Sequence, residues 1–190
     1  MTKTDIKNVD PKKVGQIDAD MWRAYYNHQF FKLFSQLLLL IKYQLQLNWL
    51  LTIRLAYYSA WAAADYRIHK YKGVNNKRVL KNLTKFYGLL SKYNAEPFDY
   101  KKTARLELAW WDVHRRSYKN NPELERSLAD AAAALYNVNV SSLKDYAHYR
   151  AEAMILPRHE GDHKEGQTDW QKITELTIKS WQALHTVIQR

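Results

Sequence analysis

The sequence predicts an all-α fold, a single-domain bundle of about six to seven helices with a long N-terminal helical hairpin. Only five glycines and four prolines occur in 190 residues, so long uninterrupted elements are expected. Apolar residues recur with the period of amphipathic helices, and no segment alternates convincingly as a strand would. Hydrophobic residues make up 46% of the chain, which is enough for one substantial core.

The first segment, residues 1–17, is polar and contains a break at Pro11–Gly15. We therefore expect a flexible N-terminal arm, followed by one all-helical domain over residues 18–190. Asp18 has a side chain suited to an N-cap, which predicts that the first helix begins near Ala19.

No glycine or proline occurs from Ala19 to Lys72, and a span of this length predicts the helical hairpin. The apolar stripe changes phase after Asn48, so we place the break between the two helices at Gln44–Trp49. The most apolar run, residues 37–55, is interrupted by charged and amide side chains. It falls short of the roughly 18 apolar residues of a membrane span, and we expect it to be a buried helix.

Five further helices are predicted from caps and apolar periodicity. Asp99 is a suitable cap, and Asn121-Pro122-Glu123 combines a cap residue, a proline at the first position and an early acid. Thr168 and Gln171 have the spacing of a capping box. The expected helices cover residues 76–91, 100 to about 120, 122–136, 141 or 142 to about 156, and the segment from 169 to about 188.

The formal charge of +11 is unevenly distributed, and residues 66–95 contain eight basic residues and no acidic one. In the helix at 76–91, Lys77, Lys81 and Lys85 lie opposite the apolar face. Lysines neutralise phosphates without regard to sequence, so this helix is a candidate for binding nucleic acid or another anionic partner. A solvated helix face is the alternative interpretation.

Cysteine is absent, which excludes disulfides, Cys-ligated metal centres and a thiol nucleophile. The N-terminus has no apolar signal-peptide core, and no transmembrane segment is predicted. We therefore expect a soluble, cytoplasmic protein. Gly-rich phosphate loops, a nucleophile elbow and the HExxH motif are also absent, which argues against the enzyme classes that depend on them.

The most informative stretch is residues 105–116, where Glu107 and His114 fall near the middle of the apolar arc of one helix. A carboxylate and an imidazole that face a core are costly unless something pairs with them. Other expected helices also place polar groups among apolar ones. These groups are Arg23 in the first helix, Arg54, Tyr58 and Asp65 in the second, and Arg150 in the sixth.

We therefore predict a buried polar pocket that binds a small molecule, and acid/base chemistry there is left open. His114 is the natural general acid or base because its ordinary pKa lies near neutrality, and Glu107 would orient or charge it. The arginines would hold an anionic group, and Tyr58 would donate a hydrogen bond. The candidate catalytic residues are Glu107 and His114, and the candidate ligand-binding residues are Arg23, Arg54, Tyr58, Asp65, Trp110, Trp111 and Arg150.

Two alternatives compete with the pocket. In the first, the inward charges form a structural ion-pair network in a non-enzymatic interaction protein. In the second, they belong to a metal site, since helix bundles bind metals through Glu and Glu-x-x-His motifs. The nearest patterns are Asp145-x-x-His148 and Asp65-x-x-x-His69, without the paired repeat, and the loop at 158–163 is rich in ligand types. The residues indicate no particular cofactor or oligomeric state.

Overall fold

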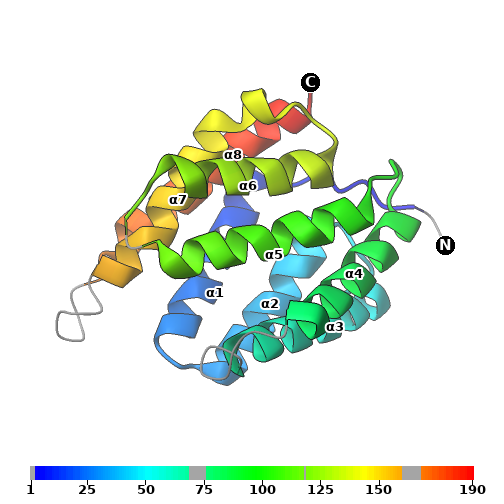
Figure 1. Cartoon of the computed structure of the whole chain (residues 1–190), viewed down its shortest axis with the longest axis horizontal. Helices are drawn as coiled ribbons and strands as arrows, with labels where there is room; N and C mark the ends of the chain where they lie inside the picture. Colours follow the sequence, from blue (N-terminus) through cyan, green and yellow to red (C-terminus); the bar gives the residue numbers. More distant parts are fainter. Residues whose placement is uncertain (1–2, 69–75, 118, 160–167) are drawn as a thin grey trace.

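A computed structural model of the chain describes residues 3–68, 76–117, 119–159 and 168–190, with only the backbone at 67–68 and 158–159. These residues form eight α-helices, one 3-10 helix and no β-strand (Figure 1). The all-α prediction is confirmed, with slightly more helices than expected. The helices are α1 (Pro11–Tyr26), α2 (Phe30–Gln44), α3 (Trp49–Ile68), α4 (Asn76–Tyr93), α5 (Tyr100–Arg116), α6 (Pro122–Tyr136), the 3-10 helix η2 (Val140–Leu143), α7 (Lys144–His159) and α8 (Trp170–Ile188).

The helices form a closed bundle around one core. Each α-helix packs on the next one in the sequence, and α8 packs on α1, which closes the ring (Figure 1). Buried apolar side chains from all eight helices line the interior. In the described part of the chain, no helix combines the length and the apolar character needed to span a bilayer.

The first helix begins earlier than predicted. α1 starts at Pro11, and the Asp10 side chain caps it by accepting two backbone N–H groups at 3.1 Å. Proline is favoured in the first helical turn, so Asp10-Pro11 is a helix start and the predicted start near Ala19 is wrong. Gly15, the other half of the expected break, allows α1 to approach α8 closely, because a Cβ there would lie 2.7 Å from the Cα of Ile178.

The described residues before α1 also pack on the bundle. The Thr4 N–H donates to the Tyr93 carbonyl at 2.8 Å, and the Ala95 N–H donates to the Thr4 carbonyl at 2.7 Å. Ile6 is buried in the core. Residues 3–10 therefore belong to the domain, and the described part of the expected flexible arm is not separate from it.

The span expected to hold two helices holds three. The predicted break at Gln44–Trp49 is confirmed, but a second break at 27–29 separates α1 from α2. His28 there has φ of 55°, a left-handed conformation that is uncommon for residues other than glycine. Arg23 therefore lies on α1, and the segment from Phe30 onward forms a separate helix, α2.

The later helices follow the predicted caps more closely than the predicted ends. Asp99 caps α5 and Asn121 caps α6, as expected. α5 ends at Arg116, before the predicted end near 120, and α7 continues to His159, past the predicted end near 156. α8 is capped by Asp169, one residue after the expected cap.

Candidate functional site

A buried ion pair connects three helices in the core. Arg150 of α7 forms a salt bridge with Asp18 of α1, and the Arg150 Nη2 also donates to Asp18 Oδ1 at 3.4 Å. The indole Nε1 of Trp181 on α8 donates to Asp18 Oδ2 at 2.9 Å. Two charges removed from water are tolerated only when such additional hydrogen bonds satisfy them. This pair therefore fixes the relative positions of α1, α7 and α8.

Glu107 of α5 has hydrogen-bond donors on both carboxylate oxygens. The hydroxyl of Tyr87 donates to Oε2 at 3.0 Å, and the indole Nε1 of Trp111 donates to Oε1 at 3.0 Å. Burial raises the pKa of Glu107, while these donors, Trp110 and the positive charge of Arg150 oppose the rise. The structure therefore brings Trp110, Trp111 and Arg150 to Glu107.

Tyr146 of α7 completes this group of polar side chains. Burial raises its pKa to about 12, against the effect of the nearby Arg150, and the negative charges of Glu107 and Asp18 add to the rise. The group extends across five helices of the bundle. We call Asp18, Tyr87, Glu107, Trp111, Tyr146, Arg150 and Trp181 the buried polar cluster.

His114 has a different environment. Two turns of α5, about 10 Å of helical rise, separate it from Glu107. Its Nε2 lies 3.4 Å from the carbonyl oxygen of Met154, and its ring packs against the rings of Trp22 and Trp110, with centroids 6.0 and 6.3 Å away. His114 is thus part of an aromatic contact between α1 and α5, and it also contacts the backbone of α7.

Four of the predicted site residues lie away from the cluster. Arg23 is exposed on α1, and Arg54 is exposed on α3. Tyr58 lies beneath the ammonium group of Lys85, and Asp65 accepts a hydrogen bond from Asn82 at 3.3 Å. The predicted face of α3 was misplaced because its core-facing side is built on other residues. These core-facing residues are Leu51, Thr52, Leu55, Ala56 and Ala62.

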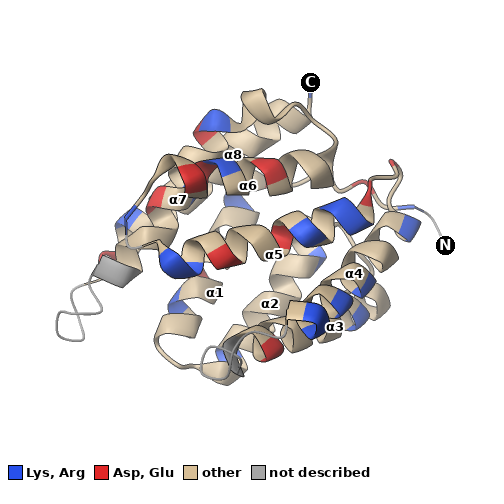
Figure 2. Ribbon diagram, viewed as in Figure 1, with Lys and Arg blue, Asp and Glu red and all other residues tan. Residues whose placement is uncertain are grey.

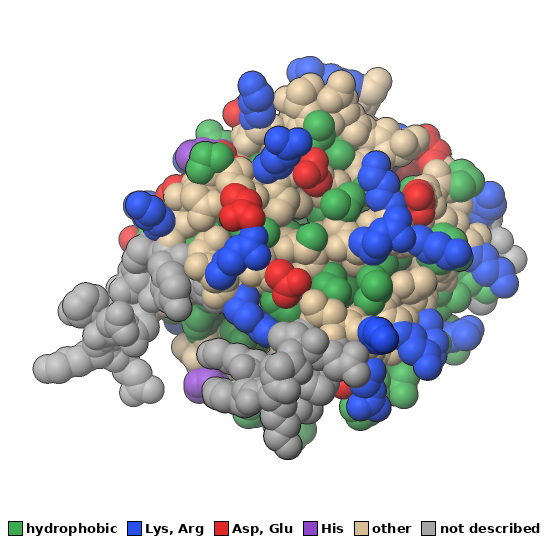
Figure 3. Space-filling view, viewed as in Figure 1, with side chains coloured by type: hydrophobic (Ala, Val, Ile, Leu, Met, Phe, Trp, Pro, Cys, Tyr) green, Lys and Arg blue, Asp and Glu red, His purple; other side chains and the backbone are tan. Residues whose placement is uncertain are grey.

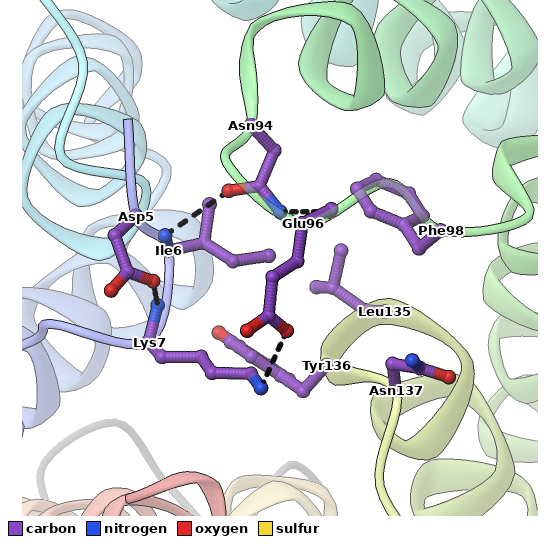
Figure 4. A pocket seen from close by; sticks show the side chains of 9 residues that line it. All are labelled: Asp5, Ile6, Lys7, Asn94, Glu96, Phe98, Leu135, Tyr136 and Asn137. Atoms are coloured by element: carbon purple, nitrogen blue, oxygen red, sulfur yellow. Dashed lines mark hydrogen bonds and ion pairs between the residues drawn. The ribbon is translucent and has the colours of Figure 1, made fainter. Parts of the chain in front are cut away.

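Two hollows in the described part of the chain lie away from Glu107 and His114. One, of about 10 Å³, is enclosed by the N-terminal segment, the α4–α5 connection and the end of α6 (Figure 4). Its wall is held by Asn94, which accepts from the Ile6 N–H at 3.3 Å and donates to the Glu96 carbonyl at 2.6 Å. The other is an open groove of about 300 Å³ between α1 and α8, lined in part by Arg23. The smaller hollow holds at most about one water molecule.

The described residues contain no group of three or more histidine and acidic side chains placed to bind a metal ion. His148 of the proposed Asp145-x-x-His148 motif instead lies 2.9 Å from Glu125, measured from Nδ1 to Oε1. His69 of the second motif lies outside the described residues, as do the side chains of the ligand-rich loop at 158–163.

Large apolar side chains face solvent on the surface of α2 and α3. Leu50 and Ile53 of α3 are 63% and 57% exposed, and Phe31 of α2 is 97% exposed. On α3 these side chains follow helical spacing and form a stripe along one face. We call Phe30, Phe31, Phe34, Trp49, Leu50, Ile53, Tyr57 and Trp61 the aromatic surface.

Basic side chains border the aromatic surface. The ammonium group of Lys42 lies 4.8 Å from the Trp49 ring centroid, and that of Lys85 lies 5.6 Å from the Tyr58 ring centroid. The ring of Tyr58 in turn lies 5.6 Å from that of Tyr57. The aromatic surface of α3 therefore continues into the exposed lysines of α4.

The lysines of α4 lie where the sequence predicted them. Lys77, Lys81, Lys85 and Lys92 are all exposed, opposite the buried side of the helix. Figure 2 marks the Lys and Arg positions along α4 and at the start of α5, and Figure 3 shows Lys and Arg side chains gathered on that side of the molecule. We call Lys77, Lys81 and Lys85 the basic stripe.

The charge and the exposed apolar residues occupy the same part of the chain. Residues 21–95 contain 12 Lys and Arg and one acidic residue, Asp65, which gives the whole formal charge of +11. The other 115 residues contain 18 basic and 18 acidic side chains and are neutral. The aromatic surface lies entirely within the charged part.

Comparisons with protein-family models, curated proteins and solved structures give no match.

Sequence reasoning found the basic stripe but missed the aromatic surface. Residues 37–55 were expected to form a buried helix, whereas they are divided between α2 and α3, with Leu51 and Leu55 buried and Leu50 and Ile53 exposed. The available signal was that α3 is apolar on every side. Such a helix must be enclosed by others or must present an apolar face.

Proposed function

We propose that the protein is a non-enzymatic binding module for an anionic partner, and that its binding site is the aromatic surface together with the basic stripe. One observation carries this proposal. The net positive charge of the chain falls within residues 21–95, and eight of the ten large apolar side chains exposed in the described residues lie on α2 and α3 in the same segment.

The apolar residues support a binding role because the fold does not need them. A contiguous exposed apolar patch on a folded protein is typical of an interaction site. Leu50, Ile53 and Trp61 face away from the core side of α3, which is already filled by Leu51 and Leu55. Their exposure is therefore best explained by contact with something outside the domain.

The buried polar cluster supports a structural role for the inward charges. Asp18 is paired with Arg150, and both oxygens of Glu107 have donors. Two groups satisfied in this way hold helices together without any ligand. The small-molecule pocket stays a prediction, and the two hollows described above include neither Glu107 nor His114.

Charge reversal on the basic stripe tests the proposal. The variant Lys77→Glu, Lys81→Glu, Lys85→Glu is compared with Lys144→Glu, Lys172→Glu, Lys179→Glu, which changes three exposed lysines of α7 and α8. Both variants lower the formal charge equally, so a difference between them reports position. We measure the salt concentration that elutes each protein from immobilised heparin.

The expected result is that the basic-stripe variant elutes at clearly lower salt than its charge-matched control. Equal elution of the two variants would contradict the proposal, because retention would then follow net charge alone.

A further inference from the structure

We infer that the anionic partner is a lipid bilayer, and that the protein binds it peripherally with the aromatic surface in the headgroup layer. This inference rests on the proposed function and names the partner of the same site. Four observations support it: the chemistry of the side chains, their projection from the surface, their alignment along α3 and the position of the lysines.

The side chains of α3 have the composition of a membrane interface. Trp49, Tyr57 and Trp61 are each about half exposed, at 51%, 58% and 50%, and they alternate along the helix with Leu50 and Ile53. Tryptophan and tyrosine collect at the boundary between headgroups and acyl chains, because each has an apolar ring and one polar group. Leucine, isoleucine and phenylalanine beside them supply the apolar area that penetrates below the headgroups.

The aromatic surface projects from the molecule. Phe31 is 97% exposed, and every other member of the aromatic surface is at least 49% exposed. The anchor residues of protein–protein interfaces typically fill pockets of matching shape. Projecting side chains are instead accommodated by a fluid bilayer, which adapts to their shape.

The aromatic stripe also has the orientation that an interfacial helix needs. From Trp49 to Trp61 it covers about 18 Å along the α3 axis, at 1.5 Å per residue. A helix with an apolar stripe of this kind lies parallel to the membrane plane. α2 and α3 are joined by the short connection 45–48 and pack on each other, and α2 has exposed apolar side chains of its own, Phe30 and Phe31.

Lysines lie at the edges of the stripe, where headgroups would be. The exposed Lys85 sits over Tyr58, and the half-buried Lys42 sits over Trp49 with its ammonium group donating to the Leu47 carbonyl at 2.9 Å. A lysine stem can lie along apolar rings while its ammonium group reaches an anionic headgroup. Each such residue increases partition onto anionic lipid by about fivefold.

Two other occupants fit these observations less well. A second copy of the chain would bring two basic stripes close together, and such like-charge contact is unfavourable. Nucleic acid would use the lysines and stack on the rings. It would leave the aliphatic Leu50 and Ile53 without a matching contact.

Vesicle co-sedimentation tests the inference. We use the full chain with phosphatidylcholine vesicles that contain or lack phosphatidylserine. The apolar variant is Phe31→Ser, Ile53→Ser, and its control is Val140→Ser, which changes an exposed apolar residue outside the aromatic surface. The charge variants described above are measured alongside, and thermal unfolding shows that every variant is folded.

We expect binding only to vesicles with phosphatidylserine. The partition coefficients of the apolar variant and of the basic-stripe variant should each be about tenfold or more lower than that of the parent. Both control variants should have the parent's partition coefficient. As a second readout, brominated acyl chains should quench the fluorescence of the bound protein, and Trp49→Phe, Trp61→Phe should remove most of that quenching.

Two outcomes would overturn the inference. Suppose that the basic-stripe variant elutes from heparin at lower salt than its control, but the parent protein does not bind phosphatidylserine vesicles. The proposed function then stands, and the lipid assignment is wrong. If vesicle binding is lost in the basic-stripe variant but unchanged in the apolar variant, the protein adsorbs by charge alone and nothing enters the headgroup layer. Failure of both the heparin and the vesicle experiments would reject the proposed function itself.

Discussion

The buried polar cluster and the aromatic surface invert the usual arrangement in opposite ways. Inside, Asp18, Glu107 and Arg150 place charge where apolar groups are normal, and each has partners within the chain. Outside, Ile53 and Phe31 place apolar groups where polar ones are normal, and their side chains face solvent. The first inversion is compensated by the fold. The second calls for a partner.

This difference separates structural from functional residues without any comparison to relatives. A polar group that the fold satisfies should cost stability when it is removed. Removal of an apolar group that the fold leaves exposed should cost little stability and should instead weaken binding to the partner.

The largest effect is expected from breaking the buried ion pair. Asp18→Ala leaves the Arg150 guanidinium buried without its carboxylate and removes the acceptor of the Trp181 indole. We expect the free energy of unfolding to fall by about 3–5 kcal/mol, measured by urea titration. Asp130→Ala, which breaks the exposed Arg126–Asp130 pair at 3.9 Å, is the control and should cost about 0.5 kcal/mol or less. Equal losses would show that the buried pair has no special structural role.

The two faces of α3 provide the next test. Leu55 is 1% exposed and Leu50 is 63% exposed, so truncation of the same residue type reports the two environments directly. Leu55→Ala should lower the free energy of unfolding by about 2–5 kcal/mol through the cavity that it leaves. Leu50→Ala should change it by about 0.5 kcal/mol or less. A large loss for Leu50→Ala would mean that this face packs in solution and is not available to a partner.

The smallest effect concerns the pH dependence of Glu107. Burial raises its pKa in the folded protein, so the folded state binds the proton more tightly than the unfolded state. Stability should therefore fall as pH rises from the unfolded value, about 4.3, through the raised folded value. The glutamine of Glu107→Gln cannot ionise. The contribution of Glu107 to the pH dependence of the unfolding free energy, measured by urea unfolding across that pH range, should therefore disappear in this variant.

The control for this prediction is Glu123→Gln, at an exposed glutamate paired with Arg116. Asp99 contributes a slope of opposite sign at lower pH, because backbone N–H donors lower its pKa. The quantity to compare is therefore the difference between each variant and the parent. An unchanged slope in Glu107→Gln would show that this carboxyl does not govern the pH response.

The sequence predicted those parts of the fold that local signals determine. The caps Asp99 and Asn121 and the break at Gln44–Trp49 were found because capping side chains and a change of apolar phase are visible in a few residues. The break at His28 was missed because no glycine or proline marks it, and its left-handed backbone depends on how α1 and α2 pack.

The candidate site shows the same limit. Glu107 and Trp111 were both named as site residues, and their hydrogen bond joins two residues one turn apart on a helix with one clear apolar side. Arg54 and Asp65 were placed inward wrongly, because a helix that is apolar all round gives no clear phase. Which side of α3 is buried depends on its packing against α2 and α4, and the chain does not encode that locally.

If the aromatic surface serves binding and not folding, Ile53→Ser should weaken vesicle binding and leave the stability of the fold almost unchanged. We would measure the free energy of unfolding and the partition onto phosphatidylserine-containing vesicles on the same preparation. We predict that the free energy of unfolding changes by about 0.5 kcal/mol or less, and that the vesicle partition coefficient falls about tenfold. A clear loss of stability with unchanged partition would contradict it, because Ile53 would then be a core residue with no role at the membrane.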